Sequence, residues 1–364
     1  MPFVQTGDIS SSECYLNSYS QTLNDAGVNV SKVFEKNAIL MTIAANIGDS
    51  AITQFAVACP DSVVGIQPYT DKANVVWLKY TLDTFKESLS NQAGKNAQKN
   101  INLQVLKPLA IPTPPLDEQK KIAEILSTWD EAISVVDRQL ENCRQQKKAL
   151  MQQLLTGKKR LPGFSGEWKK YSIGDLLYEA DGAIPWSDEE YYNLLSVKRR
   201  SEGVVLREIL QGKSILTKKM NKVSRGDFVI SKMQVVHGAW GMVPACYDKH
   251  HVSDSYIILR PKDTNTLSIP FFDYFCSQKV MYHKALQSSY GVHIEKMTFN
   301  LDLFMQEKIC IPSDINEQKA IYSLLACHDQ KLSILEKKKN ALQEEKKSLM
   351  QQLLTGKKRV AVEE

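Results

Sequence analysis

Apolar side chains recur every third or fourth residue along two long stretches of the chain, 117–160 and 316–359. Both stretches are rich in Gln, Glu, Lys, Leu and Ala, which favour helix, and neither contains proline or a glycine before Gly157 and Gly356. A glycine followed by basic residues is typical of a helix C-terminus. The pattern predicts two helices of about 40 residues, with Asp117 and Asn316 as candidate N-caps.

The apolar positions of each predicted helix alternate in spacing between four and three residues, which is typical of a coiled-coil seam. In the first helix the seam consists of Ile122, Leu126, Trp129, Ile133, Val136, Leu140, Cys143, Lys147, Leu150 and Leu154. In the second it consists of Ile321, Leu325, His328, Leu332, Leu335, Lys339, Leu342, Lys346, Leu349 and Leu353. Lys147 and Lys346 interrupt the two seams at matching places; either their stems cover the seam or they specify its register.

The two predicted helices are copies of one segment, because about 20 of 44 aligned positions are identical at a constant offset of 199. A compact domain between them would bring its two ends close together, so the second helix would start near the end of the first. We therefore expect an antiparallel coiled coil with an approximate two-fold axis. At 1.5 Å per residue it would form a spacer of about 60 Å.

The blocks that precede the helices share a series of predicted elements. Strands around a glycine-containing crossing are predicted at 223–243 and 254–261, and similar patterns occur at 33–52 and 61–68. In both blocks an amphipathic helix (73–92 and 268–288), a glycine-containing loop and a last strand ending in Ile-Pro follow. The fold class is therefore expected to be α+β, with two homologous mixed α/β domains.

These patterns divide the chain into a first domain (1–116), a first helix (117–160), a second domain (161–315), a second helix (316–359) and a tail (360–364). The first domain is shorter than the second. The additional residues of the second domain lie chiefly between 161 and about 195. The first domain is therefore expected to lack its N-terminal segment.

Composition and charge add little to this picture. The 364 residues are 43% hydrophobic and carry a net charge of only +5, so contact with a polyanion would have to be local. No apolar run approaches the roughly 18 residues of a membrane span. The seven cysteines are scattered and form no C-x-x-C pair, which fits buried thiols in a reducing compartment. A cytoplasmic protein is expected.

The sequence shows no catalytic motif that we can identify. Gly157-Lys158 and Gly356-Lys357 lack the earlier glycine of a phosphate-binding loop, and His250-His251 has no further metal ligand at suitable spacing. Asp117-Glu118-Gln119-Lys120 is similar to a nuclease carboxylate cluster, but the second copy replaces Asp117 by Asn316, as suits a helix cap. We expect a non-catalytic chain that binds no metal or cofactor.

With this order of elements, the sequence resembles the DNA specificity subunits of type I restriction-modification systems. The resemblance rests on I-P-x-P-P-L-D-E-Q-K-K-I at 111–122, I-P-S-D-I-N-E-Q-K-A-I at 311–321, the two L-L-T-G-K-K-R endings, L-P-G-F-S-G-E-W at 161–168, and the order block, helix, block, helix. It implies two target-recognition domains that each read half of a gapped site in double-stranded DNA. It also implies helices that bind two methyltransferase subunits, and nuclease-translocase subunits in the full complex. S-adenosylmethionine, ATP and Mg²⁺ would then be bound by those partners only.

Residues 198–232 contain ten basic side chains against three acidic ones, which suits a face that follows phosphates, although a solvated surface would look the same. The candidates for DNA contact here are Lys198, Arg199, Arg200, Lys213, Lys218, Lys219, Lys222, Arg225 and Lys232. Gln234 and His237 are candidates for base edges, with a structural role as the alternative for His237. The glycine-containing loops add Lys95, Asn96, Lys99, His293 and Lys296, or are ordinary turns.

Two rigidly joined readers would reject sites whose halves have the wrong separation. A spacer of about 60 Å spans at most roughly 17 base pairs. The alternatives are a coiled-coil scaffold whose terminal domains bind protein, with no role on DNA, and a self-sufficient endonuclease, for which no metal site is evident.

Overall fold

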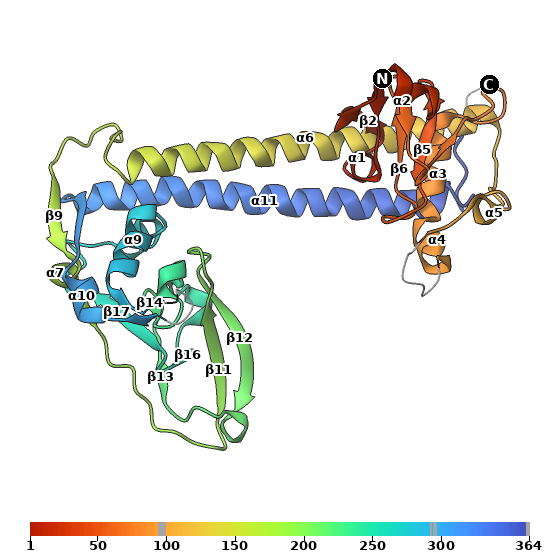
Figure 1. The fold of residues 1–364 in the computed structure, drawn as a ribbon. Helices are drawn as coiled ribbons and strands as arrows, with labels where there is room; N and C mark the ends of the chain where they lie inside the picture. The colour runs from red at the N-terminus through yellow and green to blue at the C-terminus, as the bar shows by residue number, and fades with distance from the viewer. Residues whose placement is uncertain (94–99, 292, 294–296, 362–364) are drawn as a thin grey trace. The chain divides into compact units, whose positions relative to one another are not determined.

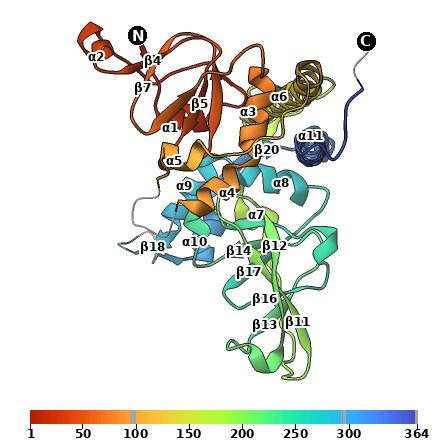
Figure 2. The same cartoon turned by 90° about the vertical axis from the view of Figure 1, so that its right-hand side faces the viewer.

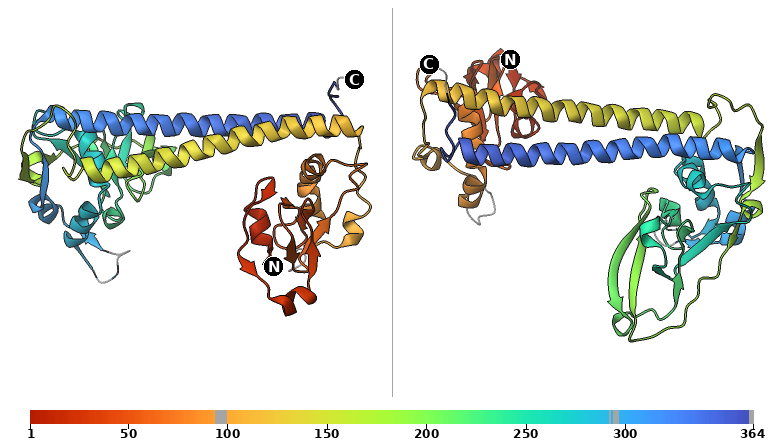
Figure 3. Two further views of the ribbon diagram at one scale, coloured as in Figure 1. Left: turned by 90° about the horizontal axis from the view of Figure 1, so that it is seen from above. Right: turned by 180° about the vertical axis from the view of Figure 1, so that it is seen from behind.

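The computed structural model describes residues 1–93, 100–291, 293 and 297–361. The chain divides into two units: unit 1 consists of Met1–Glu141 and Ser333–Glu364, and unit 2 of Asn142–Leu332. Each unit combines a globular domain with one part of each of two 39-residue helices, α6 (Leu116–Leu154) and α11 (Ile315–Leu353). Figures 1 and 3 show these helices side by side, and Figure 2 shows them end on.

The packing of α6 on α11 is antiparallel in both units. In unit 1, Ile122 and Leu126 near the start of α6 share a buried cluster with Leu353 and Leu354 at the end of α11. In unit 2, the start of α11 and the end of α6 share a cluster in the same way. Eleven seam positions are buried: Ile122, Leu126, Ile133, Val136, Leu140, Cys143, Leu154, Ile321, Leu325, Leu335 and Leu353. The other nine are half-buried, so the seam side chains face inward along both helices.

The ends of the helices differ slightly from expectation. Both begin one residue before Asp117 and Asn316, so these two side chains lie in the first turn and are not N-caps. In α11 the preceding Asp314 accepts a hydrogen bond from Asn316 N at 2.8 Å. Both helices end three residues before a glycine with positive φ, Gly157 (70°) and Gly356 (72°), as expected for C-terminal glycines.

The globular domain of unit 1 contains two four-stranded sheets with helices against one of them. Its elements are β1 (Pro2–Phe3), α1 (Thr6–Ser10), β2 (Tyr15–Leu16), β3 (Gln21–Thr22), α2 (Asp25–Asn29), β4 (Lys32–Phe34), β5 (Ile39–Thr42), β6 (Ser50–Thr53), β7 (Val57–Cys59), β8 (Val63–Ile66), α3 (Val75–Thr84), α4 (Lys86–Gln92) and α5 (Leu103–Leu106). The sheet orders are β3-β1-β7-β4 and β2-β6-β5-β8.

The globular domain of unit 2 is built on the same plan with additional strands. Its first elements are β9 (Trp168–Ser172), α7 (Ile173–Leu176), β10 (Leu177–Glu179), β11 (Tyr191–Val197), β12 (Val204–Gln211), η1 (Gly212–Ser214), β13 (Met220–Lys222), β14 (Phe228–Ser231), η2 (Val235–His237) and β15 (Trp240–Met242). They are followed by η3 (Ala245–Tyr247), β16 (His251–Ser253), β17 (Tyr256–Pro261), α8 (Ile269–Cys276), α9 (Lys279–Gln287), β18 (Ser289–Tyr290), β19 (Thr298–Phe299), α10 (Leu301–Gln306) and β20 (Lys308–Pro312).

The sheets show that the two domains are homologous. The order β3-β1-β7-β4 in unit 1 matches β12-β11-β16-β13 in unit 2, with one parallel pair at the centre of each sheet, β1–β7 and β11–β16. The antiparallel trio β6-β5-β8 matches β15-β14-β17. Alternate residues of β5 and β14 face different clusters: Ile39 and Phe228 pack toward the helices, and Leu40 and Val229 toward the second sheet.

Two expectations for the globular domains were wrong in detail. Each long amphipathic helix is two helices, α3 and α4 in unit 1 and α8 and α9 in unit 2, because polar side chains bind the last carbonyls of α3 and α8. Among the described residues the last strand occurs only in unit 2, where β20 pairs with β9. In the described part of unit 1, residues 107–112 form no strand, and no strand there corresponds to β9. A strand without a partner cannot satisfy its backbone.

The cysteines are only partly buried. Cys14, Cys59, Cys143 and Cys276 are buried, whereas Cys246, Cys310 and Cys327 are exposed, which contradicts the expectation of buried thiols for these three. Within the described residues, no helix is both long and apolar enough to cross a membrane.

Candidate nucleic-acid interface

The tip of the β11–β12 hairpin, which contains some of the residues predicted to contact DNA, is bonded to the turn around η2. Arg200 N donates to His237 O at 2.7 Å, and Ser201 N donates to Gly238 O at 2.9 Å. These bonds hold the exposed side chains of Lys198, Arg199 and Arg200 beside Gln234 and His237. We call these five residues the tip group; Figure 1 labels β11 and β12, the two strands of the hairpin.

The tip is held by side chains of the domain core. Trp240 Nε1 donates to Ser201 Oγ at 2.9 Å, and that hydroxyl lies 2.9 Å from Tyr282 OH. Gly238 has a φ of 69°, and a Cβ there would lie 2.4 Å from the Tyr282 ring. Glycine is therefore required at this position, because other residues rarely adopt this backbone conformation and a Cβ would collide with the Tyr282 ring.

Within the tip group, Oε1 of Gln234 and Nε2 of His237 are buried. Oε1 of Gln234 has no hydrogen-bond partner in the structure. A buried acceptor left without a donor costs about 1–3 kcal/mol. His237 is half-buried, and its backbone carbonyl accepts the bond from Arg200.

A second set of predicted residues lies at the other end of the hairpin. Lys213 N donates to Asp188 O, and Lys218 Nζ binds Asp188 Oδ1 at 2.6 Å. Lys218 also lies 4.8 Å from the centre of the Trp186 ring. The hydrogen bonds from Lys218 and Trp186 lower the pKa of Asp188. With the exposed Lys219, we call Lys213 and Lys218 the far-end group.

The remaining predicted cations have separate surroundings. Lys222 lies opposite His251 in the β13–β16 pair; burial, and then the Lys222 charge, lower the pKa of this histidine. Arg225 lies in a turn held by the buried Asp227, which accepts two bonds from Arg260. Lys232 Nζ donates to Asp254 O at 2.9 Å. The predicted cations of 198–232 therefore lie on several elements: the two ends of the β11–β12 hairpin, β13, and the turns before and after β14.

Of the residues predicted in the glycine-containing loops, the structure describes one. His293 is described and exposed. Lys95, Asn96, Lys99 and Lys296 lie outside the described residues.

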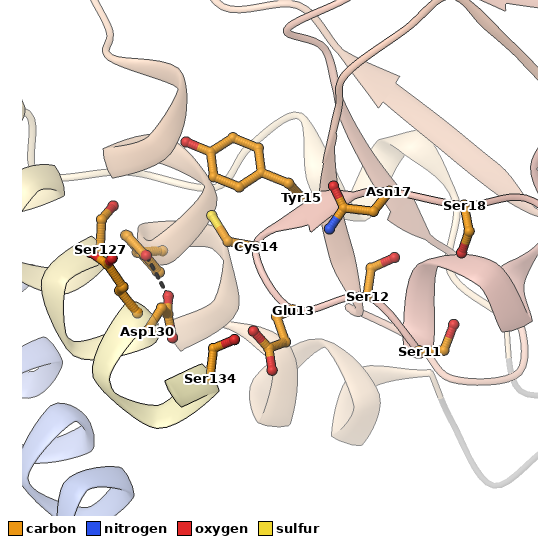
Figure 4. Close-up of a pocket in the computed structure, with 12 residues that line it drawn as sticks. Ser11, Ser12, Glu13, Cys14, Tyr15, Asn17, Ser18, Ser127, Asp130 and Ser134 are labelled. Carbon is orange, nitrogen blue, oxygen red and sulfur yellow. Dashed lines mark hydrogen bonds between the residues drawn. The ribbon is translucent and has the colours of Figure 1, made fainter. Parts of the chain in front are cut away.

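The structure also shows two hollows that the sequence did not indicate. One, of about 480 Å³ in unit 1, is drawn in Figure 4 and lined by Ser11, Ser12, Glu13, Cys14, Tyr15, Asn17, Ser18, Tyr80, Ser127, Asp130, Glu131 and Ser134. The other, of about 600 Å³ in unit 2, has five basic and no acidic lining residues: Arg144, Lys147, Lys148, Lys158 and Lys279. No group of three or more His, Cys, Asp or Glu suited to a metal ion occurs among the residues that the structure describes.

The chain is similar in sequence to proteins that are named as specificity subunits. It is 28% identical over 320 residues to a sequence from Methanocaldococcus jannaschii named as the specificity subunit of the type I restriction enzyme MjaX, covering 81% of this chain and 71% of that protein. It is 22% identical over 354 residues to the MjaVIII specificity subunit of the same organism, covering 90% of this chain and 80% of that protein.

Solved structures share the fold. The S subunit of a type I restriction-modification system from M. genitalium matches with a TM-score of 0.60 at 15% identity, over 97% of this chain and 88% of that one. The HsdS subunit from Thermoanaerobacter tengcongensis matches with a TM-score of 0.51 at 16% identity, over 97% and 90%. The family model for the type I restriction modification DNA specificity domain matches residues 1–142 and 165–344. The chain therefore belongs to the family of type I restriction-modification DNA specificity proteins, as the sequence motifs led us to expect.

Proposed function

We propose that this chain reads a gapped DNA site, each globular domain contacting one half. The observation that carries the proposal is the repetition of one sheet plan in two units, each built on its own part of the α6–α11 pair. One recognition domain discriminates poorly, because a mismatched base pair costs about 1–3 kcal/mol and each half-site is short. Two joined domains multiply their discrimination.

In unit 2 we propose the tip group as the part that contacts bases and nearby phosphates. Three exposed cations would bind phosphates, which positions the domain but carries little sequence information. Gln234 is the candidate for a base edge, because a glutamine amide can pair with adenine and its buried oxygen lacks a donor.

We further propose that α6 and α11 bind two methyltransferase subunits, and that nuclease-translocase subunits join the full complex. This chain would then act in the cytoplasm, without catalysis and without a cofactor of its own. S-adenosylmethionine, ATP and Mg²⁺ would be bound by the partners. The relatives named as specificity subunits of type I restriction enzymes support a role in specificity for this chain.

The test is to express the chain with its partner subunits and to map methylated adenines in the DNA of those cells. We expect a motif of two short defined halves separated by a fixed number of undefined base pairs. Replacing Gln234 by Ala should relax one half only. Methylation without a two-part motif, or duplex binding with no salt dependence by the purified chain, would contradict the proposal and favour the protein-binding scaffold.

A further inference from the structure

In unit 1 a single aspartate of α6 is bound at once by the other long helix and by the globular domain. Lys346 of α11 pairs with Asp130 Oδ1, and Tyr80 of α3 donates to Asp130 Oδ2 at 2.5 Å. Lys346 Nζ also lies 4.8 Å from the centre of the Tyr80 ring. Figure 4 labels Asp130 and marks a hydrogen bond at its carboxylate with a dashed line. Asp130 thus connects α3, α6 and α11.

Unit 2 contains the same arrangement with the roles of the long helices exchanged. Lys147 of α6 lies 2.5 Å from Asp329 Oδ1 of α11, and Tyr274 of α8 donates to Asp329 Oδ2. Lys147 Nζ lies 5.2 Å from the centre of the Tyr274 ring. Asp130 and Asp329 are 199 positions apart, as are Lys147 and Lys346. The two lysines that interrupt the seams are therefore members of equivalent Asp-Lys-Tyr triads.

The triads lie where such bonds have an effect. The side chains of Lys346 and Asp130 are 17% and 21% exposed, so their pair is less screened than a surface ion pair. In unit 2 the side chains of Lys147 and Asp329 are 21% and 42% exposed, so that pair is more screened than the pair in unit 1. Hydrogen bonds to a charged carboxylate are stronger than neutral ones. Burial, above all, raises the pKa values of Tyr80 and Tyr274, so both hydroxyls keep the proton that they donate.

Each triad supplies two different constraints through one carboxylate. The lysine fixes the register of the two long helices, and the tyrosine fixes how the globular domain is turned about them. In unit 1 a buried apolar cluster that includes Trp77, Ile122 and Leu353 already packs the globular domain on the long helices. Apolar packing is non-directional, so it leaves small rotations of the domain open. The hydroxyl bond selects among these rotations, because a hydrogen bond weakens steeply when its geometry is lost.

We propose that Asp130 and Asp329 are positioning residues that set the orientation of their recognition domains and thereby the gap between half-sites that the protein accepts. The inference rests on the proposed function. Neither aspartate contacts DNA in this scheme. Loosening a triad therefore leaves the sequence preference of each half unchanged and broadens the accepted gap.

The test uses the full chain with its partner subunits and duplexes whose gap is varied one base pair at a time. Tyr80→Phe keeps the ring and the lysine pair but loses the hydroxyl bond. We expect the affinity ratio between the best gap and its neighbours to fall at least about fivefold, with the half-site preference unchanged. The melting temperature should fall by only about 2–4 °C, so the variant stays folded at the temperature of the assay. Asp130→Asn should broaden the gap further. Tyr274→Phe should act in the same way through unit 2.

The matched control is Asp117→Asn, which removes an exposed pair with Lys120 on the same helix and should leave the gap preference intact. A wild-type protein without any gap preference would overturn the proposed function, and this inference with it. A wild-type protein with a sharp preference that Tyr80→Phe and Asp130→Asn both retain while folded would overturn this inference alone.

Discussion

Arg359, beyond the end of α11, donates from Nη2 to Oε2 of Glu118 in the first turn of α6 at 2.5 Å, and from Nε to Oε1 at 2.8 Å. In unit 2, Arg160 binds both oxygens of Glu317 in the same way. Both carboxylates are buried, and a buried charge needs its partners. Each pair joins the end of one long helix to the start of the other.

The Glu118 pair should make unit 1 sensitive to acid. Its hydrogen bonds, first of all those from Arg359, lower the pKa of Glu118 below its ordinary value of 4.5. The ionised carboxylate therefore stabilises the folded protein fully above pH 4.5, and this stabilisation is lost as the pH falls through the lowered pKa. We expect Glu118→Gln to melt about 2–4 °C below wild type at pH 7, as a loss of about 1 kcal/mol would cause. The difference should shrink toward pH 3. Calorimetry across this range checks it, with the exposed Glu124→Gln as control; a constant difference would contradict it.

Two glycines allow backbone and packing costs to be separated. Gly203 has a φ of 84° with open space around it, whereas Gly238 has a φ of 69° and the Tyr282 ring against it. Gly203→Ala should lower the free energy of unfolding by about 1 kcal/mol, from the backbone conformation alone. Gly238→Ala should lower it by about 2–4 kcal/mol, because the Tyr282 ring must also move. Denaturant titration measures both, and equal losses would contradict the packing around the hairpin tip.

The tip and far-end groups should differ on DNA. Replacing Lys198, Arg199 and Arg200 by Ala should reduce the salt dependence of binding, by a slope of about 0.9 for each phosphate that the variant no longer neutralises. Replacing Lys213, Lys218 and Lys219 should change it less, because Lys218 is already paired with Asp188. Affinities at several salt concentrations decide this. A larger effect from the far-end group would contradict this prediction and would indicate that the DNA interface lies at the other end of the hairpin.

Thiol reactivity should divide the cysteines into two classes. Cys246, Cys310 and Cys327 are exposed and should react rapidly with a thiol reagent at pH 8. The other four should react only after denaturation. For Cys59, burial raises the pKa to about 12, so almost no thiolate forms at pH 8 while the residue stays buried. Counting modified thiols by mass spectrometry before and after denaturant tests this, and more than three fast thiols in the native protein would contradict it.

The helices and their pairing were predictable because both leave a strong pattern in the sequence. A seam such as Ile122, Leu126 and Ile133 has one period over its whole length, and a second copy of the segment at a constant offset supplies its partner. The strands β5, β14 and β17 were predictable as short apolar runs between turn residues. The break at Ser277 and Gln278 was not, because it depends on side chains that bind the carbonyls of α8 instead of on periodicity.

The candidate site was less predictable than the fold. Counting charges in 198–232 could not show that β11 and β12 separate Lys198 from Lys213, or that Asp188 from outside the stretch binds Lys218. The repeat in the sequence indicates two of the three residues of each triad. The constant offset relates Asp130 to Asp329 as clearly as it relates the two lysines, but the tyrosines follow a different offset and are identified only by their contacts.

Unit 2 is one continuous stretch of chain, whereas unit 1 is completed by Ser333–Glu364, which follows all of unit 2. Domains generally fold in the order in which the ribosome releases them. Here the two units are completed in the opposite order. The first globular domain is synthesised early, but its contacts with Lys346, Leu353 and Arg359 form only after Ser333–Glu364 has been synthesised. A nascent chain that stalls before this segment therefore carries a finished second half and an unfinished first half.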